Sequence, residues 1–177
     1  MNEFVQFPPR EPVEGLCIVA FRVDPAAENA QFYTVFALEG ENERPAMKEG
    51  RILFFSRLEE AAAVVAASDN GLRELGEAPQ EVEILCDVGE SLYLVNSQTT
   101  DEDGVLLDCI ACLDDLVRAT QISVPADYMT VLNALSARLL ENPEFGSFLE
   151  EQGIDRERVE DAIIWCVGAV GVRSRWM

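Results

Sequence analysis

Two cysteines, Cys109 and Cys112, form a CxxC pair, a spacing that redox thiols and structural zinc sites both use. A redox pair lies at the start of a helix, where the dipole lowers the thiol pKa, whereas this pair lies inside an apolar stretch. A zinc site needs two further ligands, and the local candidates, Cys86 and Cys166, are not paired at ligand spacing. The odd total of five cysteines, which includes Cys17, favours reduced, buried thiols over zinc or disulfides.

The acidic segment 101–104, Asp-Glu-Asp-Gly, matches part of a calcium-binding loop. The same alignment places Thr99 at the first ligand position and Ile110 at the position of the bidentate glutamate, so two key ligands are missing. Acids just before an apolar helix also satisfy its free N–H groups and complement its dipole. We therefore interpret this segment as a helix cap.

Most catalytic chemistries lack their residues in this chain. It contains no histidine, which excludes Ser–His and Cys–His pairs and histidine-ligated metals, and its one lysine, Lys48, lies in a polar stretch. Adjacent carboxylates are expected by chance among 33 acids, and no glycine-rich phosphate loop is present. The sequence therefore indicates no catalytic residue, no cofactor and no metal ligand.

The chain has 177 residues with 33 acids, 13 bases and a formal net charge of −20. Binding to nucleic-acid phosphates requires clustered cations, so this balance argues against direct nucleic-acid binding. Residues 1–10 lack the basic and apolar regions of a signal peptide, and the apolar run 163–172 is too short to span a membrane. We expect a cytoplasmic protein that does not enter a membrane.

Alternation and turn signals divide the chain at residue 78 into two parts. We expect residues 1–78 to form a small α+β domain, with a small antiparallel β-sheet of about three strands and one packed helix. The strands are expected at 15–23, 31–39 and 52–55, the helix at 57–67, and a polar loop at 40–50.

Residues 79–97 fit two patterns. As a hairpin, alternate apolar residues from Val82 to Val88 would face one side, with a turn at Gly89-Glu90. As a helix, one face would carry Val82, Leu85, Cys86, Gly89, Leu92 and Tyr93. The helical pattern covers more residues and begins with a proline and acids, so we predict a helix.

Residues 79–177 are expected to form an α-helical domain of about five helices, which makes the whole chain an α+β protein. The most apolar helix, at 103–120, should be central, and Asp155 should cap the last helix. In that helix Ile164 and Trp165 point away from the apolar stripe, and Trp176 follows in the tail. Either the N-terminal domain covers these three side chains, or they form a partner surface.

These observations favour a non-enzymatic, cytoplasmic protein-interaction module whose acidic surface binds a basic protein. An inhibitor or immunity-like protein that neutralises a basic toxin is one concrete form. Two alternatives stay open. The first is an acidic mimic of nucleic acid, which would need carboxylates arrayed along one surface, and the second is an enzyme that uses carboxylates and a divalent metal.

Overall fold

The apolar run that starts at Gly15 forms the centre of the main sheet in the computed structural model, which describes residues 14–40 and 42–177. The prediction that residues 1–10 do not form a signal peptide concerns a segment that lies outside this range. The first part of the chain contains β1 (Gly15–Arg22), β2 (Phe32–Glu39), β3 (Asn42–Pro45), β4 (Met47–Lys48), β5 (Arg51–Phe54) and α1 (Ala61–Ala67), with 3₁₀ turns at Leu58–Glu60 and Leu72–Leu75.

The second part begins with one more strand and continues with helices. It contains β6 (Val82–Asp87), α2 (Val88–Ser97), α3 (Val105–Thr120), α4 (Ala126–Glu141), α5 (Gly146–Gln152), α6 (Arg156–Val172) and β7 (Ser174–Trp176). The predicted α+β class and the five helices after residue 78 are confirmed. Asp155 caps α6 as expected, since its side chain accepts a hydrogen bond from the backbone N–H of Glu157.

The strands form two sheets that contain pairs from both parts of the chain. The four-stranded sheet has the order β3-β2-β1-β6, in which β1 pairs antiparallel with β2 and parallel with β6. The three-stranded sheet has the order β4-β5-β7, and β7 pairs parallel with β5. Both sheets are therefore mixed rather than wholly antiparallel. The division of the chain at residue 78 stays a prediction.

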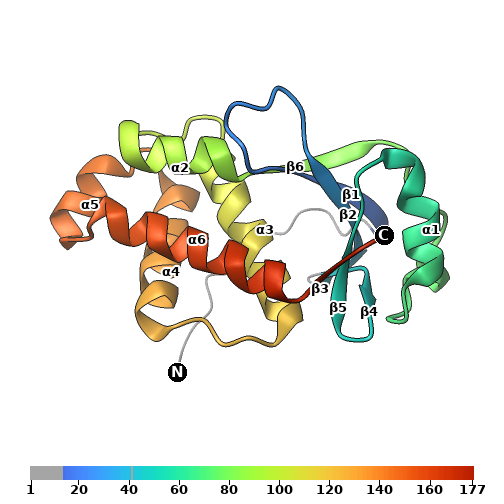
Figure 1. Cartoon of the computed structure of the whole chain (residues 1–177). Helices are drawn as coiled ribbons and strands as arrows, with labels where there is room; N and C mark the ends of the chain where they lie inside the picture. Colours follow the sequence, from blue (N-terminus) through green and yellow to red (C-terminus); the bar gives the residue numbers. More distant parts are fainter. Residues whose placement is uncertain (1–13, 41) are drawn as a thin grey trace.

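The sheets lie between α1 on one side and the larger group of helices on the other (Figure 1). Alternate β1 residues explain this arrangement because they point to opposite faces. Ile18 packs in a cluster with Val64 and Val65 of α1, whereas Val19 and Phe21 belong to the cluster that includes the buried face of α3. Helix α3 contacts α2, α4 and α6 as well as β3, β5 and β6, so it is the central helix that its apolar sequence indicated.

The prediction of one helix over residues 79–97 is wrong for its first half. Val82–Asp87 forms β6, and the helix begins only at Val88. The alternation of the hairpin alternative describes this half instead, because Ile84 and Cys86 lie on one face of the strand and pack in the cluster around α3. Pairing with β1, which lies some sixty residues away in the chain, decides the conformation of this segment.

The predicted loop at 40–50 is also wrong, because it contains the short strands β3 and β4. Pro45 pairs with Phe36, and Met47 pairs with Ile52, so both strands depend on partners outside the segment.

None of the helices in the described part of the chain combines the length and the apolar composition that a membrane span requires.

Helix α2 approaches the loop after β1 so closely that Gly89 has no room for a side chain. A Cβ atom at this position would lie 2.9 Å from the backbone nitrogen of Pro25. We expect Gly89→Ala to lower the free energy of unfolding by about 1–3 kcal/mol, because backbone atoms would have to shift.

Gly168 provides the matched control, since it lies within α6 and a Cβ atom there would meet nothing within 4 Å. Gly168→Ala should raise the free energy of unfolding by about 0.5–1 kcal/mol through helix propensity alone. Urea unfolding measures both changes. Equal effects of the two substitutions would contradict a tight contact at Gly89.

Candidate functional site

A hollow of about 230 Å³ lies between α2 and the segment that precedes α3. Its charged lining side chains are all carboxylates, those of Glu90, Asp101, Glu102 and Asp103. The other lining residues are Tyr93, Leu94, Gln98, Thr100 and Val105. The described lining therefore contains no arginine or lysine that would neutralise the carboxylates.

The start of α2 positions one wall of this hollow. The Asp87 side chain accepts a hydrogen bond of 2.9 Å from the backbone N–H of Glu90, which fixes the first turn of the helix. Helical spacing then places Glu90, Tyr93 and Leu94 on one face. Tyr93 is 51% exposed, so its ring is available to a partner.

Asp101 shapes the opposite wall. It is buried, and its two carboxylate oxygens accept hydrogen bonds from the backbone N–H groups of Leu106 and Leu107 at 3.1 and 3.0 Å. Interpretation of the acidic segment as a helix cap is thus confirmed for Asp101. Glu102 and Asp103 are exposed beside it. Carboxylates next to an exposed aromatic ring suit an arginine or lysine side chain, through ion pairs and a cation–π contact.

A second hollow, of about 410 Å³, lies near the start of α6. Its lining mixes Asp155, Glu157 and Asp161 with Arg158. Arg158 forms an ion pair with Asp127 and lies 4.7 Å from the ring centre of Tyr128. This hollow therefore has a mixed charge, and the hollow beside α2 is the better candidate for binding a cation.

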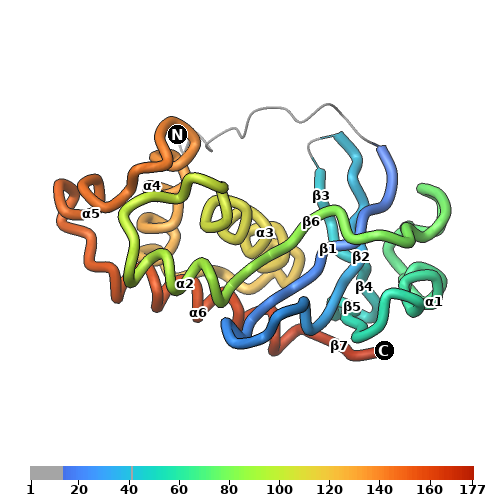
Figure 2. The backbone as a smooth tube through the Cα atoms, turned by 90° about the horizontal axis from the view of Figure 1, so that it is seen from above, coloured from blue at the N-terminus to red at the C-terminus, as the bar shows by residue number. Residues whose placement is uncertain are grey.

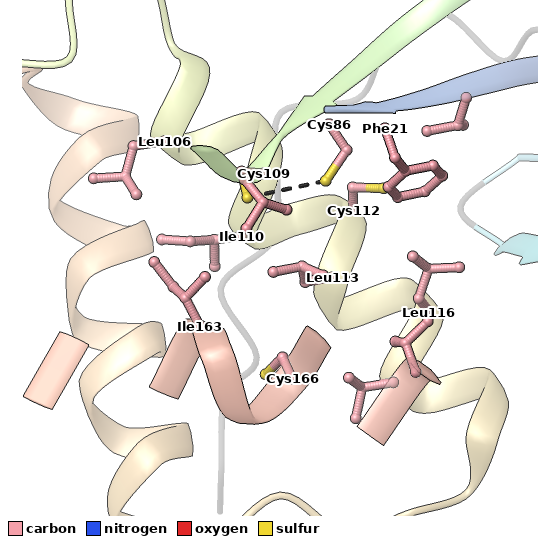
Figure 3. Close-up of a cluster of buried hydrophobic side chains, with 14 of the residues drawn as sticks. Phe21, Cys86, Leu106, Cys109, Ile110, Cys112, Leu113, Leu116, Ile163 and Cys166 are labelled. Atoms are coloured by element: carbon pink, nitrogen blue, oxygen red, sulfur yellow. Dashed lines mark hydrogen bonds between the residues drawn. The ribbon is translucent and has the colours of Figure 1, made fainter. Parts of the chain in front are cut away.

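Three thiols meet between β6 and α3. Figure 3 shows Cys86 directed at Cys109, with 3.9 Å between the two sulfur atoms. Hydrogen bonds with the thiols of Cys109 and Cys112, together with burial, raise the pKa of Cys86 well above its usual value. The sequence identified Cys86 as a candidate zinc ligand but could not predict its contact with Cys109, because that contact depends on the pairing of β1 with β6. Within the described residues, no three potential ligands are arranged to hold a metal ion.

A pair of carboxyl groups joins β3 to α3. Burial, the nearby charge of Glu43 and, to a smaller extent, that of Asp114 together raise the pKa of Asp115 to about 7, against the opposing charge of Arg118. A nitrogen of the Arg118 side chain lies 3.7 Å from a carboxylate oxygen of Asp115. The Asp115 carboxyl therefore keeps its proton in mildly acidic solution, is about half protonated at neutral pH, and shares a hydrogen bond with Glu43. Adjacent acids in the sequence could not reveal this contact between elements.

The three side chains singled out in the last helix and tail lie apart from the hollow beside α2. Ile164 is 50% exposed on α6, and Trp165 is half-buried against Tyr128 of α4, with 6.4 Å between ring centres. Trp176 packs on Phe32 and Phe54 of the first part of the chain, with 5.3 and 5.7 Å between ring centres, yet Trp176 is 58% exposed. Their assignment to an inter-domain or partner surface stays a prediction.

The buried thiols predict slow chemical modification. All five cysteines are buried, and burial raises the pKa of Cys166 to about 11. Titration with a thiol reagent at neutral pH should find almost no fast-reacting groups in the native chain and five in denaturant. Rapid native reaction of Cys109 and Cys112 would contradict the buried arrangement.

The Asp115–Glu43 contact predicts a specific pH dependence of stability. The folded chain keeps the Asp115 proton up to about pH 7, whereas an unfolded aspartate loses it near pH 4. The stability contributed by this group is therefore lost as pH rises from about 4 to 7. Asp115→Asn should raise the free energy of unfolding by about 1–3 kcal/mol at pH 8, and less at pH 5.

Urea unfolding at the two pH values measures this difference. Asp161→Asn, on the exposed side of α6, is the matched control and should change stability equally at both. The same pH dependence in both variants would assign the effect to overall charge repulsion instead.

Comparison with known proteins identifies a similar fold without identifying a family. No protein-family model and no curated protein matches the chain. A solved structure described as the SatS C-terminal domain in complex with bromine is similar, with a TM-score of 0.57 and 13% sequence identity. The match covers 92% of this chain and 94% of that chain. At this identity the likeness supports the α+β fold alone.

Proposed function

We propose that this chain is a non-enzymatic, cytoplasmic protein-interaction module that binds a basic protein through the hollow beside α2. The observation that carries the proposal is one hollow whose lining holds four carboxylates, no arginine or lysine, and the exposed Tyr93 ring. An arginine or lysine of the partner would enter it and meet both kinds of contact. The net charge of −20 would speed the approach of a basic partner over long range.

The pairing of the chain's own cations supports an acidic outer surface. Each of seven arginines forms an ion pair with a carboxylate of the same chain, namely Arg22, Arg44, Arg57, Arg118, Arg138, Arg158 and Arg175. These contacts leave carboxylates in excess at the hollow, where the described residues place no cation. A basic partner would therefore find an excess of carboxylates there.

A charge-neutralised variant tests this site. Glu90→Gln, Glu102→Gln and Asp103→Asn together remove the free carboxylates of the hollow while leaving the capping residue Asp101 unchanged. The matched control, Glu150→Gln, Glu151→Gln and Glu157→Gln, removes the same number of charges from exposed positions elsewhere. Affinity capture from the host, followed by identification and affinity measurement of bound proteins, compares the two variants with the unaltered chain.

We expect the hollow variant to weaken binding of captured basic proteins by about tenfold or more, and the control to weaken it much less. Tyr93→Ala should weaken binding of the same proteins, although it does not change the net charge. Equal losses in the two charge variants would show that the acids act through net charge alone, and the proposed site would be wrong.

A further inference from the structure

Strand β6 forms an open edge of the four-stranded sheet. The strand order β3-β2-β1-β6 gives it a neighbour on one side only (Figure 2). Among the described residues, no hydrogen bond joins the backbone of 82–86 to any element other than β1. In a strand, alternate residues direct their N–H and C=O groups to opposite edges. Part of the β6 backbone therefore faces away from the sheet with unpaired hydrogen-bonding groups.

The side chains of this edge are unusually apolar for an exposed strand. Val82 is 40% exposed and Leu85 is 48% exposed. Proteins usually protect such edges with lysines, prolines or a covering element, because an open apolar edge can pair with another chain. Both edge strands pack against α3. The opposite edge strand, β3, ends in Pro45, whereas β6 contains no proline or lysine and has a register shift near Val82.

Acidic side chains flank the open edge. Glu81 and Glu83 are exposed, and Glu90 follows on α2. Arg22 lies near the end of the strand but is already paired with Asp87. A second copy of this chain would bring its own Glu81 and Glu83 to the same edge, so like charges disfavour self-pairing. A basic strand would instead gain ion pairs.

We propose that the β6 edge binds an extended basic segment of a partner protein, which adds to the sheet as a further strand. The proposal rests on the proposed function in requiring a basic partner, but it names a different surface and a main-chain mode of recognition. Alternate apolar side chains of the segment cover Val82 and Leu85, and its lysines or arginines meet Glu81 and Glu83. Main-chain hydrogen bonds supply affinity that does not depend on one particular side chain.

The first test uses a defined probe, a fluorescent twelve-residue peptide of alternating lysine and valine. Fluorescence anisotropy with the full chain should show saturable binding, and a glutamate–valine peptide should not bind. Two further peptides carry N-methyl groups on the backbone nitrogens, in one peptide at the valines and in the other at the lysines. Each peptide therefore lacks alternate backbone N–H donors. At least one of them should bind about tenfold more weakly, since only one set of donors faces β6. Unchanged binding of both would overturn the proposal.

The second test changes the chain. Glu81→Lys with Glu83→Lys should weaken binding of the lysine–valine peptide by about tenfold or more, and Leu85→Ser should also weaken it. The matched controls are Glu150→Lys with Glu151→Lys, and Val172→Ser, all at exposed positions outside the four-stranded sheet. Equal weakening by edge variants and controls would overturn strand addition in favour of nonspecific charge attraction.

Two outcomes separate this proposal from the proposed function. If the hollow variant loses basic partners while the edge variants keep both partners and peptide, the β6 proposal is wrong and the proposed function stands. Sedimentation supplies the other outcome. A dimer of the unaltered chain that Leu85→Lys disrupts would assign the edge to a second copy, and it would overturn a basic partner there.

Discussion

The buried carboxylate of Asp87 holds together the elements on which the candidate site depends. Asp87 is the last residue of β6 and the N-cap of α2, and it pairs with Arg22 at the adjacent position of β1. One side chain therefore joins the sheet to the first turn of the helix that carries Glu90 and Tyr93. Because Asp87 is only 5% exposed, loss of either Asp87 or Arg22 would leave the charge of the other with too little compensation. The need to keep the Asp87 carboxylate paired therefore fixes the direction in which α2 leaves the sheet.

Much of the helical part follows from local sequence, and much of the strand pairing does not. Helices α3, α4 and α6 have apolar faces of several turns and clear ends, so their periodicity predicts them. Residues 82–87 fit both the apolar spacing of a helix and the alternation of a strand. The segment extends because β1 offers a parallel partner and the cluster around α3 contains the contacts of Ile84 and Cys86. β7 is a three-residue strand that follows α6, and only the presence of β5 makes it one. Such pairings join distant segments that local propensity cannot identify.

The candidate site was only partly accessible from sequence for the same reason. The acids at 101–103 were visible, and Asp101 was correctly interpreted as part of a cap. The partner wall was not visible, because Glu90, Tyr93 and Leu94 share a helical face only once β6 is recognised as a strand that ends at Asp87. With that boundary, their spacing would have indicated an acidic and aromatic face. The Cys86–Cys109 contact and the Asp115–Glu43 contact likewise join elements whose proximity depends on the sheet.

The acidity of the chain and the open edge of β6 form one physical problem. An exposed apolar strand invites pairing with other copies, and the usual protection by lysine is absent from this edge. Glutamates at 81 and 83 provide a selective form of protection, because they repel a second acidic copy at short range while the net charge of −20 repels it at longer range. The same charges would attract a basic segment. An acidic edge can therefore resist self-association and still accept a strand, provided that the strand brings the opposite charge.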